Sequence, residues 1–273
     1  MNKHPLPGIM KFHRGFYSRI LKNRRTLLVC LPFSYRAEKA RRYPVIYMHD
    51  GQNVFDSSTS FSGVEWGAYE TAAALAKESP PLEAIIVGIY NKGDARISEY
   101  APDRDAVRGG GKGREYSEFL VKEVKPFIDG KYRTLGGRED TSVAGSSLGG
   151  LISLFLILEY PGVFSKAGVL SPSLHWAGHT LLPLAKQKAD SGKMKIWLSM
   201  GTEEGGKPRK SKNLSESVLD SRKLRDILLA KGFKKNKNLI YYEEKGGRHN
   251  EAYWARLLPD VFRFFLAKRA RGQ

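Results

Sequence analysis

The feature of this sequence that most constrains its fold is a regular alternation of two kinds of segment. From about residue 44 onward, short apolar runs rich in β-branched residues alternate with segments of helical periodicity. The run Ala84–Tyr90 is almost entirely apolar, which is typical of a strand buried on both faces of a parallel sheet. The alternation therefore predicts an α/β fold, with a mostly parallel central sheet flanked by helices on both faces.

The pattern gives bounds for the individual elements. Strands are expected at Arg25–Pro32, Pro44–His49, Ala84–Tyr90, Asp140–Gly145, Lys166–Leu170, Lys195–Gly201 and Asn238–Glu243. Helices are expected at Trp66–Lys77, Glu115–Ile128, Leu148–Tyr160, Leu181–Asp190, Ser217–Lys231 and Glu251–Ala270. Two glycine-containing segments, Arg108–Gly113 and Gly205–Asn213, are expected to be loops, the first of them mobile.

Neither an internal repeat nor a linker divides the 273 residues, so we expect one domain over residues 1–273. Residues 1–24 are expected to form a partly irregular N-terminal extension. The single cysteine, Cys30, rules out an intramolecular disulfide and a multi-cysteine metal site. No apolar run approaches the roughly 18 residues that a membrane helix needs, and the N-terminus does not resemble a signal peptide. A cytoplasmic protein without a membrane partner is the expectation.

The chain is strongly basic, with 46 lysines and arginines against 28 acidic residues and a net charge of +18. Such an excess attracts anions at low salt, including nucleic acid. The sequence contains no recognised nucleic-acid-binding motif, so we expect no specific nucleic-acid partner. The charge is therefore interpreted as a solvated surface or as a preference for an anionic substrate, and the sequence does not separate the two.

The strongest chemical signal is the segment Gly145–Gly149, which has the pattern Gly-x-Ser-x-Gly with Ser147 at its centre. This pattern alone occurs by chance in roughly one chain in ten of this length. Its context is more informative, because an apolar strand precedes it and an apolar helix follows, as in a nucleophile elbow. We expect glycine two residues either side of the serine because a Cβ there would meet neighbouring backbone. Ser147 would then lie at a helix N-terminus, where negative charge is stabilised.

A serine hydroxyl needs a base to become a useful nucleophile. In this kind of fold the order along the chain is serine, acid, histidine, and three of the six histidines follow Ser147. His249 lies in a loop between the last predicted strand and the C-terminal helix, at the edge of the sheet expected to carry Ser147. His175 and His179 leave too little room for an acid before them. His249 is therefore the predicted base.

The acid should follow the predicted strand Lys195–Gly201. Glu203 and Glu204 both lie in the next loop, and either could orient the imidazole, with Glu204 favoured. Glu216 and Asp220 lie further along the chain and remain alternatives.

Acyl transfer also requires donors for a developing oxyanion. The segment Tyr47–Asn53 ends an early strand in a glycine-containing turn, and the backbone amides of Gln52 and Leu148 are the candidates. Asp50 and Gly51 either contribute to this role or only form the turn.

Taken together, several motifs make the chain resemble the esterase branch of the α/β-hydrolases, from about Arg25 to the end. This branch includes enterochelin and other siderophore esterases, feruloyl and acetylxylan esterases, S-formylglutathione hydrolase and the mycolyltransferases. The motifs are Tyr43–Asp56, Glu65–Gly67, Ala144–Gly150, Ser171–Ser173, Gly201–Gly205 and Gly247–Trp254. The set is specific for the family and not for a substrate.

The resemblance implies roles for particular residues. Ser147 would be the nucleophile, His249 the base and Glu204 the acid, although in the mycolyltransferases the acid lies on a later segment that resembles the one around Glu216. The oxyanion amides would be those of Gln52 and Leu148. His175 and Trp176 would flank the acyl group, and Trp66 is a substrate-pocket or a structural residue.

The sequence thus predicts a serine esterase that cleaves a small-molecule carboxylic ester through an acyl-enzyme, without a metal or an organic cofactor. Acyl transfer or peptide hydrolysis by the same three residues is an alternative, and a non-catalytic protein with a basic binding surface is another. Secreted relatives carry export signals that are not seen here, which counts against a mycolyltransferase or a secreted plant-wall esterase unless the chain is already mature. The sequence predicts neither the ester nor the oligomeric state.

Overall fold

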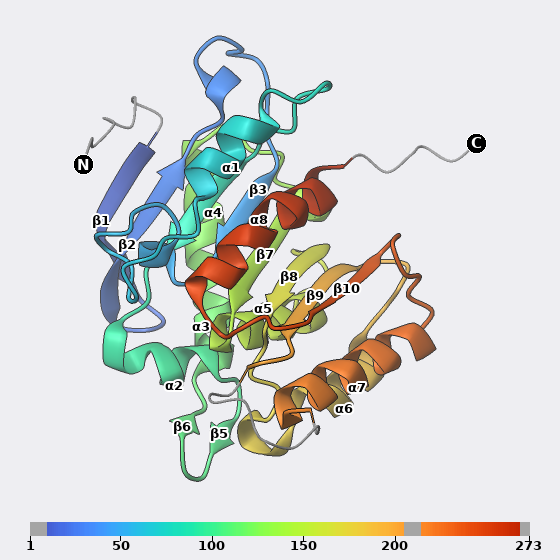
Figure 1. Cartoon of the computed structure of the whole chain (residues 1–273). Helices are drawn as coiled ribbons and strands as arrows, with labels where there is room; N and C mark the ends of the chain where they lie inside the picture. Colours follow the sequence, from blue (N-terminus) through green and yellow to red (C-terminus); the bar gives the residue numbers. More distant parts are fainter. Residues whose placement is uncertain (1–9, 205–213, 268–273) are drawn as a thin grey trace.

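The fold is built on one eight-stranded sheet, seen in a computed structural model that describes residues 10–204 and 214–267 (Figure 1). The strand order is β1-β2-β4-β3-β7-β8-β9-β10. The strands are β1 (Met10–Ser18), β2 (Asn23–Cys30), β3 (Val45–Met48), β4 (Ile85–Ile89), β7 (Thr141–Ser146), β8 (Lys166–Leu170), β9 (Lys195–Gly201) and β10 (Leu239–Glu244). Neighbouring strands from β4 to β10 are parallel, whereas β2 is antiparallel to both β1 and β4.

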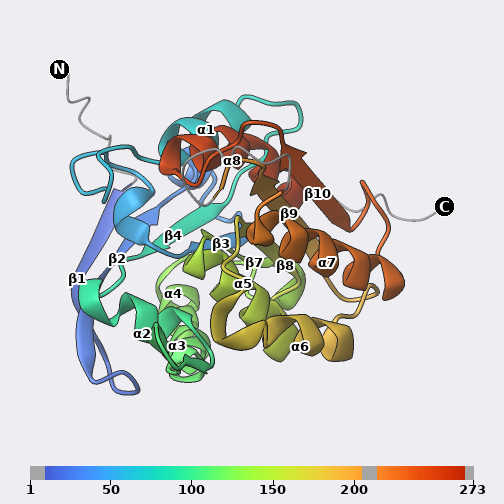
Figure 2. The same cartoon turned by 60° about the horizontal axis from the view of Figure 1, so that its bottom comes forward.

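Helices cover both faces of this sheet, which confirms the predicted α/β architecture (Figure 2). They are α1 (Ala68–Leu75), α2 (Arg96–Tyr100), α3 (Gly113–Phe119), α4 (Lys125–Lys131), α5 (Leu148–Glu159), α6 (Leu181–Lys188), α7 (Glu216–Ala230) and α8 (Glu251–Leu266). Helices α1 and α8 contact each other on one face, while α3, α4, α5 and α6 lie on the other. A π-helical turn, Leu120–Val124, joins α3 to α4.

Each of the seven predicted strands is present, within two residues at either end. The structure adds detail to two other expectations. Within the expected partly irregular extension over residues 1–24, Met10–Ser18 forms β1 and pairs with β2, while residues 1–9 lie outside the described part of the chain. This strand carries mostly exposed and half-buried residues, so it lacks the apolar run that identified the other strands.

The expected mobile loop Arg108–Gly113 is also partly regular. Gly109–Gly110 forms β6, which pairs with β5 (Arg104–Asp105), and Gly113 begins α3. The indole Nε1 of Trp176 donates a hydrogen bond to the Gly109 carbonyl at 3.2 Å, so this hairpin is attached to the body of the protein. The expected loop Gly205–Asn213 and the expected end of the last helix, at Ala270, lie outside the described residues.

Helix α5, which follows the predicted nucleophile, is almost completely buried. Eleven of its twelve residues are buried, because it packs between strands β7 and β8 and helices α2, α3 and α6. An apolar helix of this kind is stable only when it is covered on every side. Its first residue follows Ser147 directly, so the position of that serine is fixed by the core of the protein.

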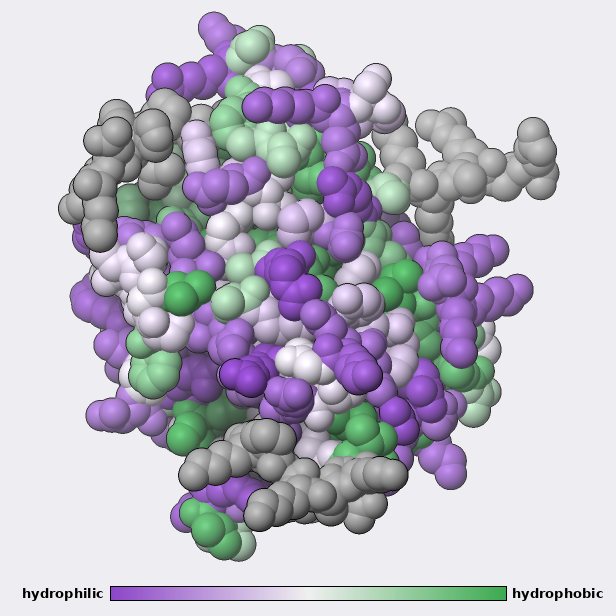
Figure 3. All heavy atoms as spheres, viewed as in Figure 1, coloured by the Kyte–Doolittle hydropathy of each residue, from purple (hydrophilic) through white to green (hydrophobic). Residues whose placement is uncertain are grey.

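Polar residues dominate the face of the molecule drawn in Figure 3, with apolar residues scattered among them. Within residues 10–204 and 214–267, no helix has both the length and the apolar character required to span a bilayer.

Candidate active site

Ser147 lies on the sharp turn between β7 and α5. Its backbone has φ 59° and ψ −123°, a conformation that non-glycine residues rarely adopt and that is found at functional sites. The Ser147 amide donates to the Leu170 carbonyl at 3.0 Å, which attaches the turn to the end of the neighbouring strand β8. The sequence therefore folds locally into the strand–turn–helix geometry of a nucleophile elbow.

Two glycines, Gly145 and Gly150, permit this turn, whereas the sequence motif predicted Gly145 and Gly149. A Cβ on Gly145 would lie 2.8 Å from backbone atoms of Gly149, as the motif predicted. A Cβ on Gly149 would approach no heavy atom closer than 3.4 Å, which is an ordinary contact. The second constraint falls instead on Gly150, whose Cβ would lie 2.8 Å from the Leu170 carbonyl oxygen. The expected clash at Gly149 was wrong because its Cβ would point toward side chains of the turn after β3.

His249 contacts Glu204. The two residues lie on the loops that follow β10 and β9, and His249 Nδ1 is 2.8 Å from Glu204 Oε2. The Glu204 side chain is 2% exposed and that of His249 is 39% exposed. The other carboxylate oxygen of Glu204 accepts a hydrogen bond from the Gly201 amide at 2.9 Å and another from the Ser171 hydroxyl. Both oxygens are therefore held, and a neutral His249 that donates from Nδ1 has its Nε2 lone pair available as a base.

The other candidate acids have different partners. Glu203 pairs with Arg248 at 3.3 Å. Asp220 and Glu216 lie 2.8 and 3.8 Å from His179. Among the four acids left open by the sequence, Glu204 is therefore the one that contacts His249.

Ser147 and His249 lie at the same edge of the sheet, because both follow carboxyl ends of parallel strands. The Ser147 hydroxyl lies 3.3 Å from the hydroxyl of Ser173, and its described contacts do not include a hydrogen bond to His249. Trp254 connects the two regions, since its indole donates to Ser171 Oγ at 2.9 Å and packs edge-on against the His249 ring, 4.9 Å between centroids. A hydrogen bond between a catalytic serine and its histidine often tightens only when substrate binds.

Ser171, Ser173 and Trp254 were not assigned individual roles from the sequence, although all three lie within motifs of the resemblance. Ser171 links the acid to the indole of Trp254, and Ser173 is the described partner of the Ser147 hydroxyl. The motifs therefore pointed to these three residues, but the sequence did not show which side chains they contact.

The turn after β3 carries the candidate oxyanion donor Gln52. Neither the Gln52 amide nor the Leu148 amide hydrogen-bonds to any residue in the described parts of the chain. The two follow β3 and β7, which are adjacent parallel strands. Asp50 begins the turn with φ 54°, in the left-handed region, and is 5% exposed.

Arg96 on α2 holds this turn in place. Its guanidinium contacts both carboxylate oxygens of Asp50 at 2.7 Å, and Asn91 donates to one of them at 2.7 Å. Burial opposes ionisation of Asp50, but the charge of Arg96 and these hydrogen bonds lower its pKa overall. The backbone amide of Asp50 donates to Tyr100 Oη at 3.0 Å, so α2 fixes the turn through two side chains.

We expect Arg96→Met to lower the free energy of unfolding by about 3 kcal/mol, because it leaves the buried Asp50 carboxylate without its cation. Arg96→Lys should cost less, since it keeps the charge but loses the two-point contact. Urea unfolding followed by circular dichroism measures both. Equal stability of the wild type and Arg96→Met would show that the pair does not hold the turn.

His49 lies beside this turn and is 2% exposed. Burial lowers its pKa to about 3, with the nearby charge of Asp50 opposing the shift and that of Arg96 adding to it. Its Nδ1 lies 2.9 Å from the hydroxyl of Tyr116. His49 is therefore neutral at physiological pH and contributes to packing around the candidate oxyanion donors.

This pKa predicts a pH dependence of stability. Between about pH 6.5 and 3 the unfolded chain binds a proton at His49 that the folded protein does not, so stability falls as pH falls through this range. The slope should reach up to about 1.4 kcal/mol per pH unit. Urea unfolding between pH 7.5 and 5 tests this against His49→Asn, whose amide can replace Nδ1. An unchanged slope in that variant would contradict the assignment.

The three residues predicted to contact substrate lie in different surroundings. Trp66 is 3% exposed and packs on Trp254, with centroids 5.9 Å apart, so most of its surface contacts protein. Trp176 is 8% exposed and is bonded to the β5–β6 hairpin. His175 is partly buried, and burial followed by the charge of Arg108 lowers its pKa. A cavity of about 400 Å³ is lined by the hairpin residues Arg104 to Arg108 together with Ala177 and Gly178.

Comparison with known proteins decides the family. A family model described as "Putative esterase" matches residues 18–265. The chain belongs to this esterase family. The match includes every residue of the elbow, the histidine loop and the acid loop, and it confirms the resemblance drawn from the motifs.

Individual relatives and a solved structure are similar to this chain. The chain is 26% identical over 262 residues to the uncharacterized protein YbbA of Bacillus subtilis, covering 93% of this chain and 98% of that one. It is 30% identical over 152 residues to the ferri-bacillibactin esterase BesA of the same species, covering 49% of each. The crystal structure of the BES protein from Bacillus cereus superposes with a TM-score of 0.74 at 19% identity, covering 98% of this esterase and all of that chain. The fold is thus that of the α/β-hydrolase esterases.

Proposed function

We propose that this esterase is a serine hydrolase that cleaves a small-molecule carboxylic ester through Ser147, His249 and Glu204. The observation that carries the proposal is the 2.8 Å contact between His249 Nδ1 and Glu204 Oε2, at the sheet edge where Ser147 occupies its strained turn. Nucleophile, base and orienting acid follow parallel strands of one sheet. This arrangement matches the roles required for acyl transfer to a serine.

In the proposed reaction, Ser147 Oγ leaves Ser173 and attacks the ester carbonyl carbon while its proton moves to His249 Nε2. Glu204 keeps the imidazole in the required tautomer and stabilises its charged form. The amides of Gln52 and Leu148 donate to the oxyanion. His249 then protonates the departing alcohol, and a water that it activates hydrolyses the acyl-enzyme.

The substrate class follows from charge and relatives. A chain with a net charge of +18 attracts anionic esters at low salt. The similar protein BesA is a ferri-bacillibactin esterase, so siderophore esters belong in the first substrate panel, with aryl, sugar and thiol esters beside them. Partners of the protein are accordingly small-molecule esters in this proposal.

Covalent labelling tests the proposal directly. A fluorophosphonate should modify one residue, Ser147, and p-nitrophenyl acetate or butyrate should be hydrolysed by the wild type. Ser173→Ala is the matched control for labelling, because it removes the neighbouring hydroxyl and leaves Ser147 with His249. Loss of labelling in Ser147→Ala and its retention in Ser173→Ala is the expected result, whereas an unlabelled wild type that hydrolyses no ester would overturn the proposal. Product analysis with competing alcohols, or with an aminoacyl anilide, distinguishes hydrolysis of esters from acyl transfer and from peptide hydrolysis.

A further inference from the structure

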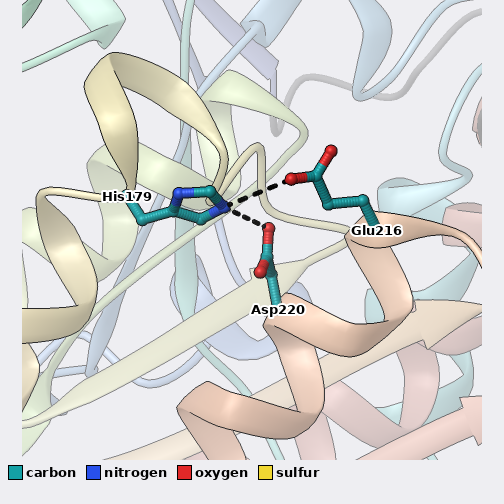
Figure 4. Close-up of side chains that lie close together, drawn as sticks. All are labelled: His179, Glu216 and Asp220. Atoms are coloured by element: carbon teal, nitrogen blue, oxygen red, sulfur yellow. Dashed lines mark hydrogen bonds and ion pairs between the residues drawn. The ribbon is translucent and has the colours of Figure 1, made fainter.

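A second cluster of titratable side chains lies outside the proposed catalytic group. His179 follows the turn Trp176–Gly178, and Glu216 and Asp220 are one turn apart at the start of α7 (Figure 4). His179 Nε2 is 2.8 Å from Asp220 Oδ2 and 3.8 Å from Glu216 Oε1. One donor atom from each residue lies within 4.8 Å of the other two. Three donors from two separate segments thus converge on one point.

The cluster combines a fixed donor with accessible ones. The Asp220 side chain is fully buried, and its second oxygen accepts a hydrogen bond from Lys223 at 3.0 Å. Such an outer partner orients a ligating carboxylate. The side chains of His179 and Glu216 are 31% and 75% exposed, so an ion could enter from solvent and retain water.

The charge around the cluster also favours a cation. Two carboxylates converge here in a chain that is otherwise strongly basic, and Lys223, whose side chain is 60% exposed, pairs with Asp220. Both carboxylates also act on the neighbouring His175, where each raises its pKa against the effect of burial and of Arg108.

We propose that His179, Glu216 and Asp220 form a binding site for one divalent transition-metal ion of the Zn²⁺ class. Imidazole nitrogen with carboxylate oxygen is a donor set that Zn²⁺ prefers. Bonds of about 2.1 Å in a tetrahedral site separate donor atoms by about 3.4 Å. The separation of Nε2 and Oδ2 would open by about half an ångström and that of Nε2 and Oε1 would close by a similar amount, which the exposed Glu216 permits.

In the absence of an ion, His179 and Asp220 pair with each other. A bound ion would take the place of this hydrogen bond, with Nε2 and Oδ2 as its ligands. The sequence predicted no metal, because the proposed reaction needs none and the single cysteine rules out a multi-cysteine site. The cluster was not foreseen, because His179 and Asp220 are 41 residues apart in the chain.

The site would join the loop Ser171–Thr180 to α7. This loop carries Ser173, whose hydroxyl lies 3.3 Å from that of Ser147, and it is bonded to the β5–β6 hairpin through Ala177 and Asp105 at 3.1 Å. A bound ion would therefore hold this loop at His179, in addition to its contacts at Ser173 and Ala177. This consequence rests on the proposed function, whereas the binding itself does not.

Metal titration of the full chain tests the site. The protein is dialysed against EDTA and then against metal-free buffer, and Zn²⁺ binding is followed by isothermal titration calorimetry at pH 7.5, with Co²⁺ absorption as a spectroscopic readout of ligand geometry. The wild type should bind one equivalent with a Co²⁺ visible band. Glu216→Gln, a substitution at an exposed position, should weaken binding by about 10-fold or more, and His179→Gln should remove the band.

Matched variants keep the test decisive. His13→Gln and Glu203→Gln make the same chemical changes away from the cluster and should bind Zn²⁺ as the wild type does. Ser147→Ala should also bind normally, which separates this inference from the proposed function. Failure of the wild type to bind an equivalent, or equal affinity in the wild type, His179→Gln and Glu216→Gln, would overturn the metal site and leave an ion pair only.

Discussion

Replacement of Ser147 by alanine is expected to lower kcat for an ester substrate by about 10⁴- to 10⁶-fold. The substitution removes the atom proposed to form the acyl-enzyme, while the proposed oxyanion amides and substrate contacts remain. The small side chain fits the turn as the serine does, so the free energy of unfolding should change little. Initial rates with p-nitrophenyl butyrate, measured on protein of confirmed circular dichroism spectrum, give the comparison.

The paired variant Ser147→Ala/His249→Ala provides the control. Residues that act as one unit are strongly non-additive, so the double variant should lose little more activity than Ser147→Ala alone. Multiplicative losses would indicate that the two side chains act independently. Retention of the wild-type rate by Ser147→Ala would exclude this serine as the nucleophile.

The second large effect is expected at Glu204. Glu204→Gln should lower kcat by about 10³- to 10⁴-fold, because the amide can present its NH₂ group to Nδ1 and so favour the wrong imidazole tautomer. The pH–rate profile should change as well, because the carboxylate no longer holds the imidazole that is proposed to act as the base. Steady-state kinetics between pH 5.5 and 9 measure both effects.

Glu203→Gln is the matched comparison, because the neighbouring carboxylate pairs with Arg248 and its side chain is 39% exposed. This variant should retain most of its activity. If Glu203→Gln lost much activity and Glu204→Gln lost little, Glu203 and not Glu204 would be the residue that orients His249.

Periodicity was sufficient to predict the buried part of the fold. Strands β4 and β9 are mostly apolar and buried on both faces, and an apolar run of that kind has few other stable environments in water. Strand β1 was missed because it is an antiparallel edge strand with an exposed face. Helix α2 was missed because five residues are too few to show a helical period, although it supplies both Arg96 and Tyr100 to the turn after β3.

The candidate site was predictable to the extent that its chemistry depends on local sequence. The turn at Ser147 requires a particular local pattern, and His249 follows from chain order. The choice among four acids could not be made from spacing, because adjacent side chains such as Glu203 and Glu204 point in different directions from one loop. It depends on contacts such as the hydrogen bond from the Gly201 amide to Glu204. The same limitation hid the pairing of Asp50 with Arg96, which are separated by 46 positions.

The proposed base and the proposed nucleophile are attached to parts of the sheet that differ in stability. Ser147 lies between central strand β7 and a helix enclosed by the core. His249 follows β10, which pairs only with β9 among the described residues and has mostly half-buried side chains. Local unfolding of β10 and the loop after it would displace the His249 imidazole while the rest of the sheet stayed folded. On heating, hydrolysis should therefore cease at a lower temperature than the one at which the helical signal disappears, and it should return on cooling.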